Sequence, residues 1–201
     1  MYGRNSYRGL QVRALAQPVN LLEMHRLSRT RYPFFLQSTV VGPPLGRYDI
    51  LFAFPGESLE LAGSGRLTGT HSTGAPGFLA ALDAWWRTEK RDGPVPELPF
   101  HGGWFVYLGY DLAAEIEPVL DLSADPVLPT AFAVRCPAAI IHDHAERQTW
   151  FVAETDAAID IGTNSIHLVI AEISPEGDFR VIGSDKDMVR LGRGGFGRCH
   201  G

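Results

Sequence analysis

Residues 159–165, IDIGTNS, are of types that can bind a phosphate and a metal ion. Asp160 lies in an apolar run, where a carboxylate is costly to bury unless it meets a cation or hydrogen-bond donors. Gly162 lets a ligand approach the backbone, and the amides and hydroxyls of Thr163 and Ser165 can cradle phosphate oxygens. Asp160 would then hold a Mg²⁺ ion, directly or through water. The alternative is a plain β-hairpin with a polar turn, because Gly and Asn are common in turns.

A second group of candidate ligands is His142, Asp143 and His144. On a strand, the two imidazoles would share one face. Zinc sites need three or four ligands, however, and no further ligand lies at a useful spacing. Residues 142–147 also have the composition of a hairpin tip. We therefore interpret this group as a polar turn rather than a metal site.

The apolar patterns predict more strands than helices. Helices are expected over 19–29 and 78–90, with a third that starts at residue 112 and is ended by Pro118. Strands are expected over 34–41, 47–54, 102–111, twice within 130–154 around the polar turn, and over 157–162, 166–173 and 179–183. The connections are hairpin-like, which predicts an α+β fold with mainly antiparallel sheets and two or three helices.

Composition limits the classes of function. The chain has 201 residues, 45% of them apolar, which suits one globular domain or two small ones. A net charge of -5 without Lys or Arg runs argues against nucleic-acid binding. No apolar run is long enough for a signal peptide or a membrane helix. The cysteines, Cys136 and Cys199, have no metal-type spacing and indicate a cytoplasmic protein with free thiols.

Residues from about 10 to 154 resemble the N-terminal region of aminodeoxychorismate synthase component I and, more distantly, of anthranilate synthase component I. Four segments carry the resemblance: RYPFFLQST, GRYDILFAFPG, LPFHGGWFVYLGYDL and VLPTAFAVRCPAAIIHDHAERQTWFVAE. These enzymes convert chorismate, with ammonia from a glutamine amidotransferase partner, to aminodeoxychorismate or anthranilate. Their catalytic residues and Mg²⁺ ligands lie in a C-terminal half without counterpart here, so we expect a domain that is inactive alone.

In that family the N-terminal region contributes a tryptophan pocket. The family's L-x-S and R-[FY]-D elements match this chain, and the resemblance implies that L-tryptophan would contact Leu36, Ser38, Arg47, Tyr48 and Asp49. Many anthranilate synthases have Glu before the Ser, where this chain has Gln37.

Residues from about 157 to 195 are similar to the beginning of exopolyphosphatase and guanosine pentaphosphate phosphatase enzymes of the actin-like ATPase superfamily. Asp160 and the run Gly162, Thr163, Asn164 and Ser165 fall on the first phosphate loop of that family. This resemblance implies phosphate binding by the loop and a C-terminal hairpin of actin-like ATPase type. The family's second phosphate loop and catalytic glutamate have no counterpart here.

The two resemblances meet near residues 154–156, which predicts a domain over 1–154 and a truncated hairpin over 155–201. A truncated or mosaic reading frame is one explanation for this junction. The first hypothesis for function is a component I N-terminal domain that acts as a scaffold or tryptophan-binding module. The alternatives are a phosphatase-family fragment that binds phosphate through residues 160–165 and a non-catalytic interaction protein.

Overall fold

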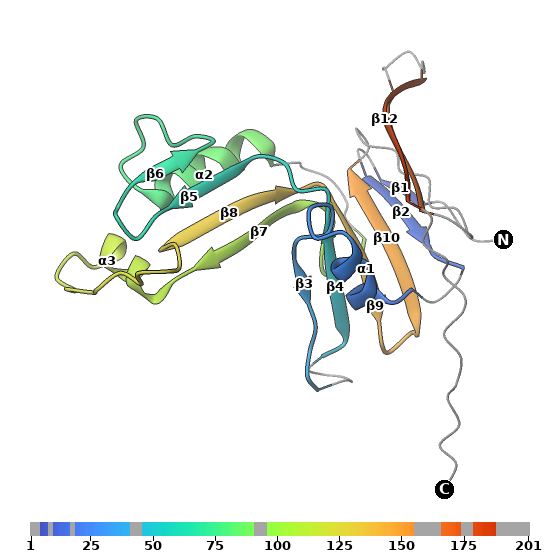
Figure 1. Ribbon diagram of the computed structural model, residues 1–201, viewed down its shortest axis with the longest axis horizontal. Coiled ribbons are helices and arrows are strands. Elements are labelled where there is room, and N and C mark those ends of the chain that lie inside the picture. Colours follow the sequence, from blue (N-terminus) through green and yellow to red (C-terminus); the bar gives the residue numbers. More distant parts are fainter. Residues whose placement is uncertain are drawn as a thin grey trace, which may run out of the picture.

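The computed structural model describes residues 5–7, 10–16, 19–40, 46–90, 96–154, 166–173 and 179–187. These residues form two large antiparallel sheets, a two-stranded antiparallel sheet, three α-helices and one short 3-10 helix (Figure 1). The predicted α+β class with antiparallel sheets is confirmed. None of the helices among these residues is long and apolar enough to cross a membrane.

The larger sheet has six strands in the order β1-β2-β10-β9-β4-β3. Their bounds are Asn5–Tyr7 for β1, Leu10–Ala14 for β2, Gln148–Glu154 for β10, Ala138–Asp143 for β9, Tyr48–Ala53 for β4 and Phe35–Leu36 for β3. The first two strands were not expected, although Leu10 and Val12 are buried and alternate with exposed Gln11 and Arg13. That alternation is the usual signature of a half-buried strand.

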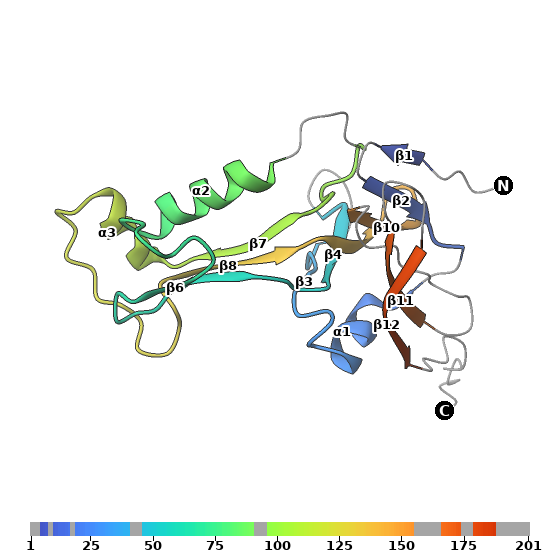
Figure 2. The ribbon, with the colours of Figure 1, turned by 90° about the horizontal axis from the view of Figure 1, so that it is seen from above.

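The second sheet has four strands in the order β6-β5-β8-β7. They span Leu67–Gly69 for β6, Ser58–Leu61 for β5, Ala131–Cys136 for β8 and Gly103–Leu108 for β7. Helix α2, Phe78–Glu89, lies along one face of this sheet (Figure 2). Its buried residues Phe78, Ala81 and Trp85 recur at helical spacing and pack against Leu59 and Ala133 of the sheet.

Two pairs of consecutive strands carry the chain from one sheet into the other. Strand β4 leads into β5, and β8 leads into β9 across Pro137. Proline has no N–H to donate, which suits the point where a strand leaves one ladder for the next. At the matching bend Phe54 has a positive φ of 58°, an uncommon conformation for a bulky residue, and its N–H donates to Arg31 O at 2.8 Å. The 130–154 region therefore forms three strands instead of the two expected.

Helix α1, Leu21–Leu27, covers one face of the six-stranded sheet. Asn20 caps it by accepting a hydrogen bond from Glu23 N at 3.1 Å. The buried Leu21 and Met24 pack on a core formed with Leu51, Ala53, Ala138, Ile140, Phe151 and Ala153. The opposite face has its own core, which includes Ile141 and Val152 and is covered in part by Leu98 and Phe100.

The remaining elements follow the predictions in part. Residues 110–116 form a 3-10 turn, Tyr110–Leu112, and α3, Ala113–Ile116, so the third predicted helix exists but is short. Glu115 of α3 accepts hydrogen bonds from Phe78 N at 2.9 Å and Leu79 N at 2.8 Å and thereby caps α2. Strands β11, Ile166–Ile173, and β12, Phe179–Asp187, pair as an antiparallel hairpin, as expected from the sequence.

Candidate functional site

The two segments predicted to hold tryptophan are neighbours in the six-stranded sheet. Strand β3 pairs with β4, with Phe35 opposite Leu51 and Leu36 opposite Ile50. Gly46, at a φ of 83°, lies against Val40 O and Ser38 Oγ so closely that a Cβ atom would overlap both. Glycine is therefore required where the chain enters β4. The backbone thus places the L-x-S and R-Y-D elements beside each other, and tryptophan binding by them stays a prediction.

Asp49 is the central acidic group of this region. It is only 6% exposed, on the same face of β4 as the core residues beneath α1. Gln37 Nε2 donates to its Oδ2 at 3.1 Å. His144 Nε2 lies 3.0 Å from the same oxygen, without the alignment of a hydrogen bond. Asp49 Oδ1 is buried and has no hydrogen-bond partner among the described residues.

A buried carboxylate oxygen without a hydrogen-bond partner is a candidate contact for a ligand. Buried polar atoms nearly always have a partner, because leaving one unpaired costs about 1–3 kcal/mol. A ligand that brought an N–H or ammonium group to Asp49 Oδ1 would remove that cost. Asp49 Oδ1 is therefore an acceptor of this region with capacity left for a ligand, beside the equally unpartnered His144 Nε2.

Arg47 is engaged elsewhere in the fold. Its Nε and Nη2 donate to the Asp143 carboxylate at 3.1 and 2.7 Å, and its guanidinium lies 4.8 Å from the Tyr48 ring centroid. The hydrogen bonds from Arg47 hold the pKa of Asp143 below its usual range against the opposing effect of burial, with help from the N–H groups of Glu146 and Ala145. Arg47 thus ties β4 to the β9–β10 turn.

Leu36 and Ser38 do not contact Asp49. Leu36 lies opposite Ile50 and so faces the other side of the sheet from Asp49, with 48% of its surface exposed. The Ser38 hydroxyl donates to Val40 O at 2.8 Å in a local turn. Gln37, the middle residue of the L-x-S element, is the one that contacts Asp49.

Residues 144–147 form the turn between β9 and β10, whereas His142 and Asp143, which we had placed in this turn, are the last residues of β9. The rings of His142 and His144 are neighbours with centroids 4.7 Å apart, and His142 Nδ1 lies 3.0 Å from Thr149 Oγ1. Asp143 projects to the opposite face, toward Arg47. No group of three or more His, Cys, Asp or Glu side chains in the described part of the chain is arranged to hold a metal ion. Sequence reasoning had not connected His144 with Asp49, because the two are distant in the chain.

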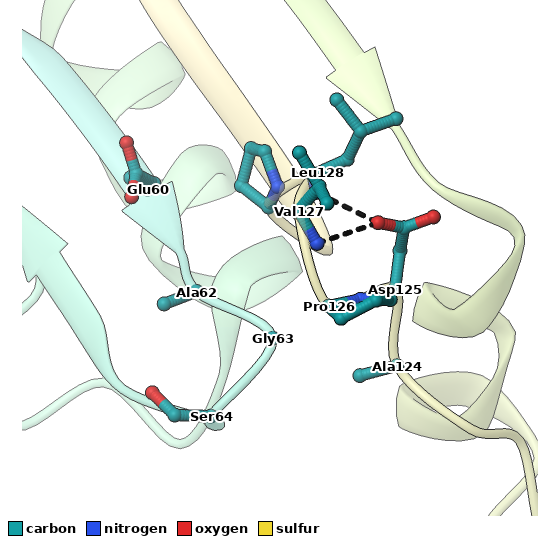
Figure 3. A pocket seen from close by; sticks show the side chains of 10 residues that line it. Glu60, Ala62, Gly63, Ser64, Ala124, Asp125, Pro126, Val127 and Leu128 are labelled. Carbon is teal, nitrogen blue, oxygen red and sulfur yellow. Dashed lines mark hydrogen bonds between the residues drawn. The ribbon is translucent and has the colours of Figure 1, made fainter.

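A hollow lies at the far end of the four-stranded sheet, between the β5–β6 turn and residues 124–129 (Figure 3). It encloses about 420 Å³ and is lined by Glu60, Ala62, Gly63, Ser64 and the loop 124–129. Its acidic loop residue, Asp125, accepts hydrogen bonds from Val127 N at 2.7 Å and Leu128 N at 2.8 Å, which lower its pKa. Its carboxylate is thus used to shape the loop, and no Lys or Arg lines the hollow.

The predicted phosphate loop, Asp160 with Gly162, Thr163, Asn164 and Ser165, lies outside the described residues. Phosphate and Mg²⁺ binding there remain predictions from the sequence. The following hairpin of β11 and β12 has a register shift between Ile170 and Ala171.

Comparison with known proteins supports the first of the two resemblances. The chain is 34% identical over 116 residues to an anthranilate synthase component I-like protein of Synechocystis sp. (strain ATCC 27184 / PCC 6803 / Kazusa). The similarity covers 57% of this chain and 22% of that relative, so the chain spans about a fifth of the relative's length. No family model matches the chain. The comparison thus shows similarity to part of an anthranilate synthase component I-like protein.

Proposed function

We propose that residues 10–154 are the N-terminal domain of a chorismate-aminating synthase component I and that this domain has a non-catalytic role. The observation that carries the proposal is the similarity over 116 residues to the component I-like relative. In a complete synthase the substrate would be chorismate, and a glutamine amidotransferase subunit would supply ammonia. For this domain we propose a scaffold role together with the binding of a free amino acid.

We further propose that the amino acid is L-tryptophan and that its ammonium group is held by Asp49. The buried Oδ1 of Asp49 has no hydrogen-bond partner in the described structure, whereas Gln37 already donates to Oδ2. An ammonium at Oδ1 would make a charge-assisted hydrogen bond, the stronger kind. A glutamate at position 37 could not donate in this way at neutral pH. The Gln37 carboxamide and the Asp49 carboxylate together supply one negative charge for one positive ligand group.

Titration calorimetry with L-tryptophan on the 201-residue chain tests this function. We expect heat of binding, and we expect Asp49→Asn to weaken binding by about 10- to 100-fold, the size of a lost charged hydrogen bond of about 1.5–3 kcal/mol. Asp83→Asn is the matched control, because Asp83 is an exposed residue of α2 that pairs with Arg87 at 2.9 Å. Its affinity should equal that of the unmodified chain.

The ligand offers a second control. Indole-3-propionate keeps the ring and carboxylate of tryptophan but lacks the ammonium group, so its binding should be weaker by a similar factor. Equal affinities for the two ligands would contradict the role of Asp49. Absence of any heat with L-tryptophan would contradict tryptophan binding by this domain.

A further inference from the structure

Two side chains that touch each other in the six-stranded sheet each have a buried polar atom without a hydrogen bond. These atoms are Asp49 Oδ1 and His144 Nε2, both unpartnered in the described structure. His144 Nε2 lies 3.0 Å from the other oxygen of the same carboxylate, Asp49 Oδ2. Buried polar groups are rarely left unpaired. Two of them on neighbouring side chains therefore indicate one binding site that uses both.

The position of the His144 ring is fixed by its surroundings. Its backbone N–H donates to Arg47 O at 2.9 Å, which ties the turn after β9 to the residue before β4. Its ring stands at 88° to that of His142, with the centroids 4.7 Å apart, and His142 Nδ1 lies 3.0 Å from Thr149 Oγ1. The imidazole is thus held beside the Asp49 carboxylate before any ligand arrives.

The contact with Asp49 indicates which nitrogen of His144 carries a proton. An imidazole nitrogen without a proton is an acceptor, and at 3.0 Å it would be repelled by a carboxylate oxygen. With a proton, Nε2 is a donor and is attracted. Its N–H bond is not aligned with Asp49 Oδ2, however, because the pair does not form a hydrogen bond. Nε2 is therefore a donor with capacity left for an acceptor of a ligand.

A free α-amino acid carries the complementary pair of groups. Its ammonium donates, its carboxylate accepts, and both are attached to one carbon atom. Asp49 Oδ2 already accepts from Gln37 Nε2 at 3.1 Å, so the ammonium would bind at Oδ1. The carboxylate would then meet His144 Nε2. Each contact would be a charge-assisted hydrogen bond, the stronger kind.

We propose that His144 is a specificity-determining residue, whose Nε2 donates to the carboxylate of the amino acid whose ammonium Asp49 holds. This role rests on the proposed function and deepens it, because it restricts the ligand to an amino acid and disfavours a simple amine. A site built to form a hydrogen bond with one group of its ligand rejects an analogue without that group.

Titration calorimetry with L-tryptophan and tryptamine tests this role, because tryptamine keeps the indole ring and the ammonium group but has no carboxylate. The unmodified chain should bind L-tryptophan at least about tenfold more tightly than tryptamine. In His144→Asn, whose amide reaches only as far as Nδ1, this ratio should fall close to one, with the affinity for tryptamine nearly unchanged. His144→Gln places an amide donor near the position of Nε2 and should restore part of the preference.

His71→Asn is the matched control. His71 is an exposed residue between β6 and α2, on the other sheet, and its φ of 58° suits asparagine. Both affinities should equal those of the unmodified chain, and circular dichroism should show that every variant is folded.

The outcomes separate this role from the proposed function. If L-tryptophan binds and Asp49→Asn weakens it, but tryptamine binds equally well or His144→Asn keeps the preference, the role of His144 is overturned and the proposed function stands. Absence of heat with L-tryptophan would overturn both.

Nitrogen NMR of protein labelled at the histidine ring nitrogens tests the position of the proton without a ligand. His144→Asn assigns the His144 signals, and Nε2 should carry a proton in the unliganded chain. Added L-tryptophan should shift the Nε2 signal more than tryptamine does. An Nε2 atom without a proton in the unliganded chain would overturn the proposal even if L-tryptophan binds.

Discussion

The six-stranded and four-stranded sheets differ at their borders. At the β9–β10 turn of the six-stranded sheet, polar and charged side chains bind one another. The edge of the four-stranded sheet is β7, a strand without charged residues. The first region contains Arg47 and Asp143 in a double hydrogen bond, with Asp49 close to Gln37 and His144. The second contains β7, whose outer edge has no partner among the described strands. The first region pairs most of its polar groups internally but leaves Asp49 Oδ1 and His144 Nε2 without a hydrogen bond, and the second leaves a backbone edge unpaired among the described strands.

The hydrogen-bonding groups that the fold leaves without a partner indicate what each region can bind. In the first region two side-chain atoms, Asp49 Oδ1 and His144 Nε2, have no hydrogen-bond partner, and one donor would satisfy the former. In the second region the outer N–H and C=O groups of a six-residue strand have no partner strand among the described residues, and water can satisfy such groups where they are exposed. The predictions below test the first region.

The largest effect in the first region is expected from Asp143→Asn. The Asp143 side chain is 2% exposed and is held by Arg47 and two backbone N–H groups, so the substitution should cost about 1–3 kcal/mol of the free energy of unfolding at pH 7. Urea unfolding of both proteins measures the difference.

The pH dependence of that difference follows from the pKa of Asp143. Because folding lowers this pKa, the stabilisation is present above the ordinary carboxyl pKa of about 3.9 and is lost as the pH falls through the lower folded value. The two proteins should therefore approach equal stability at acid pH. A difference that stayed constant to pH 2 would contradict the ionic contribution of Asp143.

A smaller effect is expected from Gln37→Glu. The substitution replaces a donor 3.1 Å from Asp49 with a second carboxylate, so one hydrogen bond is lost and two like charges become neighbours. The free energy of unfolding at pH 7 should fall by about 1 kcal/mol, the value of a typical hydrogen bond. Protonation of the introduced glutamate removes the repulsion, so the deficit should shrink as the pH is lowered. Gln37→Met keeps the size without charge, and its deficit should not depend on pH in this way.

Much of the fold could be predicted from sequence patterns. The apolar spacing of α2 and the apolar run of β4, closed by Pro55 and Gly56, led directly to the observed elements. The division of 130–154 into three strands could not be predicted as easily, because Pro137 marks a passage between sheets and not a turn. Local patterns do not report which sheet a strand joins, since that depends on contacts with strands distant in sequence.

The candidate site was predictable only in part. The resemblance directed attention to Asp49 and Arg47, and the structure brings both segments together. The partners of these residues, His144 and Asp143, are about a hundred positions away, and their local context indicated only a polar turn. The spacing of residues within one segment does not show that Arg47 pairs with Asp143. It also does not show that Arg47 has partners while Asp49 Oδ1 has none.

The most direct test of the central claim is to observe the Asp49 carboxylate by carbon NMR while L-tryptophan is added. The protein is labelled at the aspartate side-chain carbons, and Asp49→Asn assigns the Asp49 signal. Ligand ammonium at Oδ1 should shift the Asp49 signal progressively to saturation, whereas the Asp143 signal, already held by Arg47, should stay in place. An Asp49 signal that does not move at saturating L-tryptophan would contradict the account.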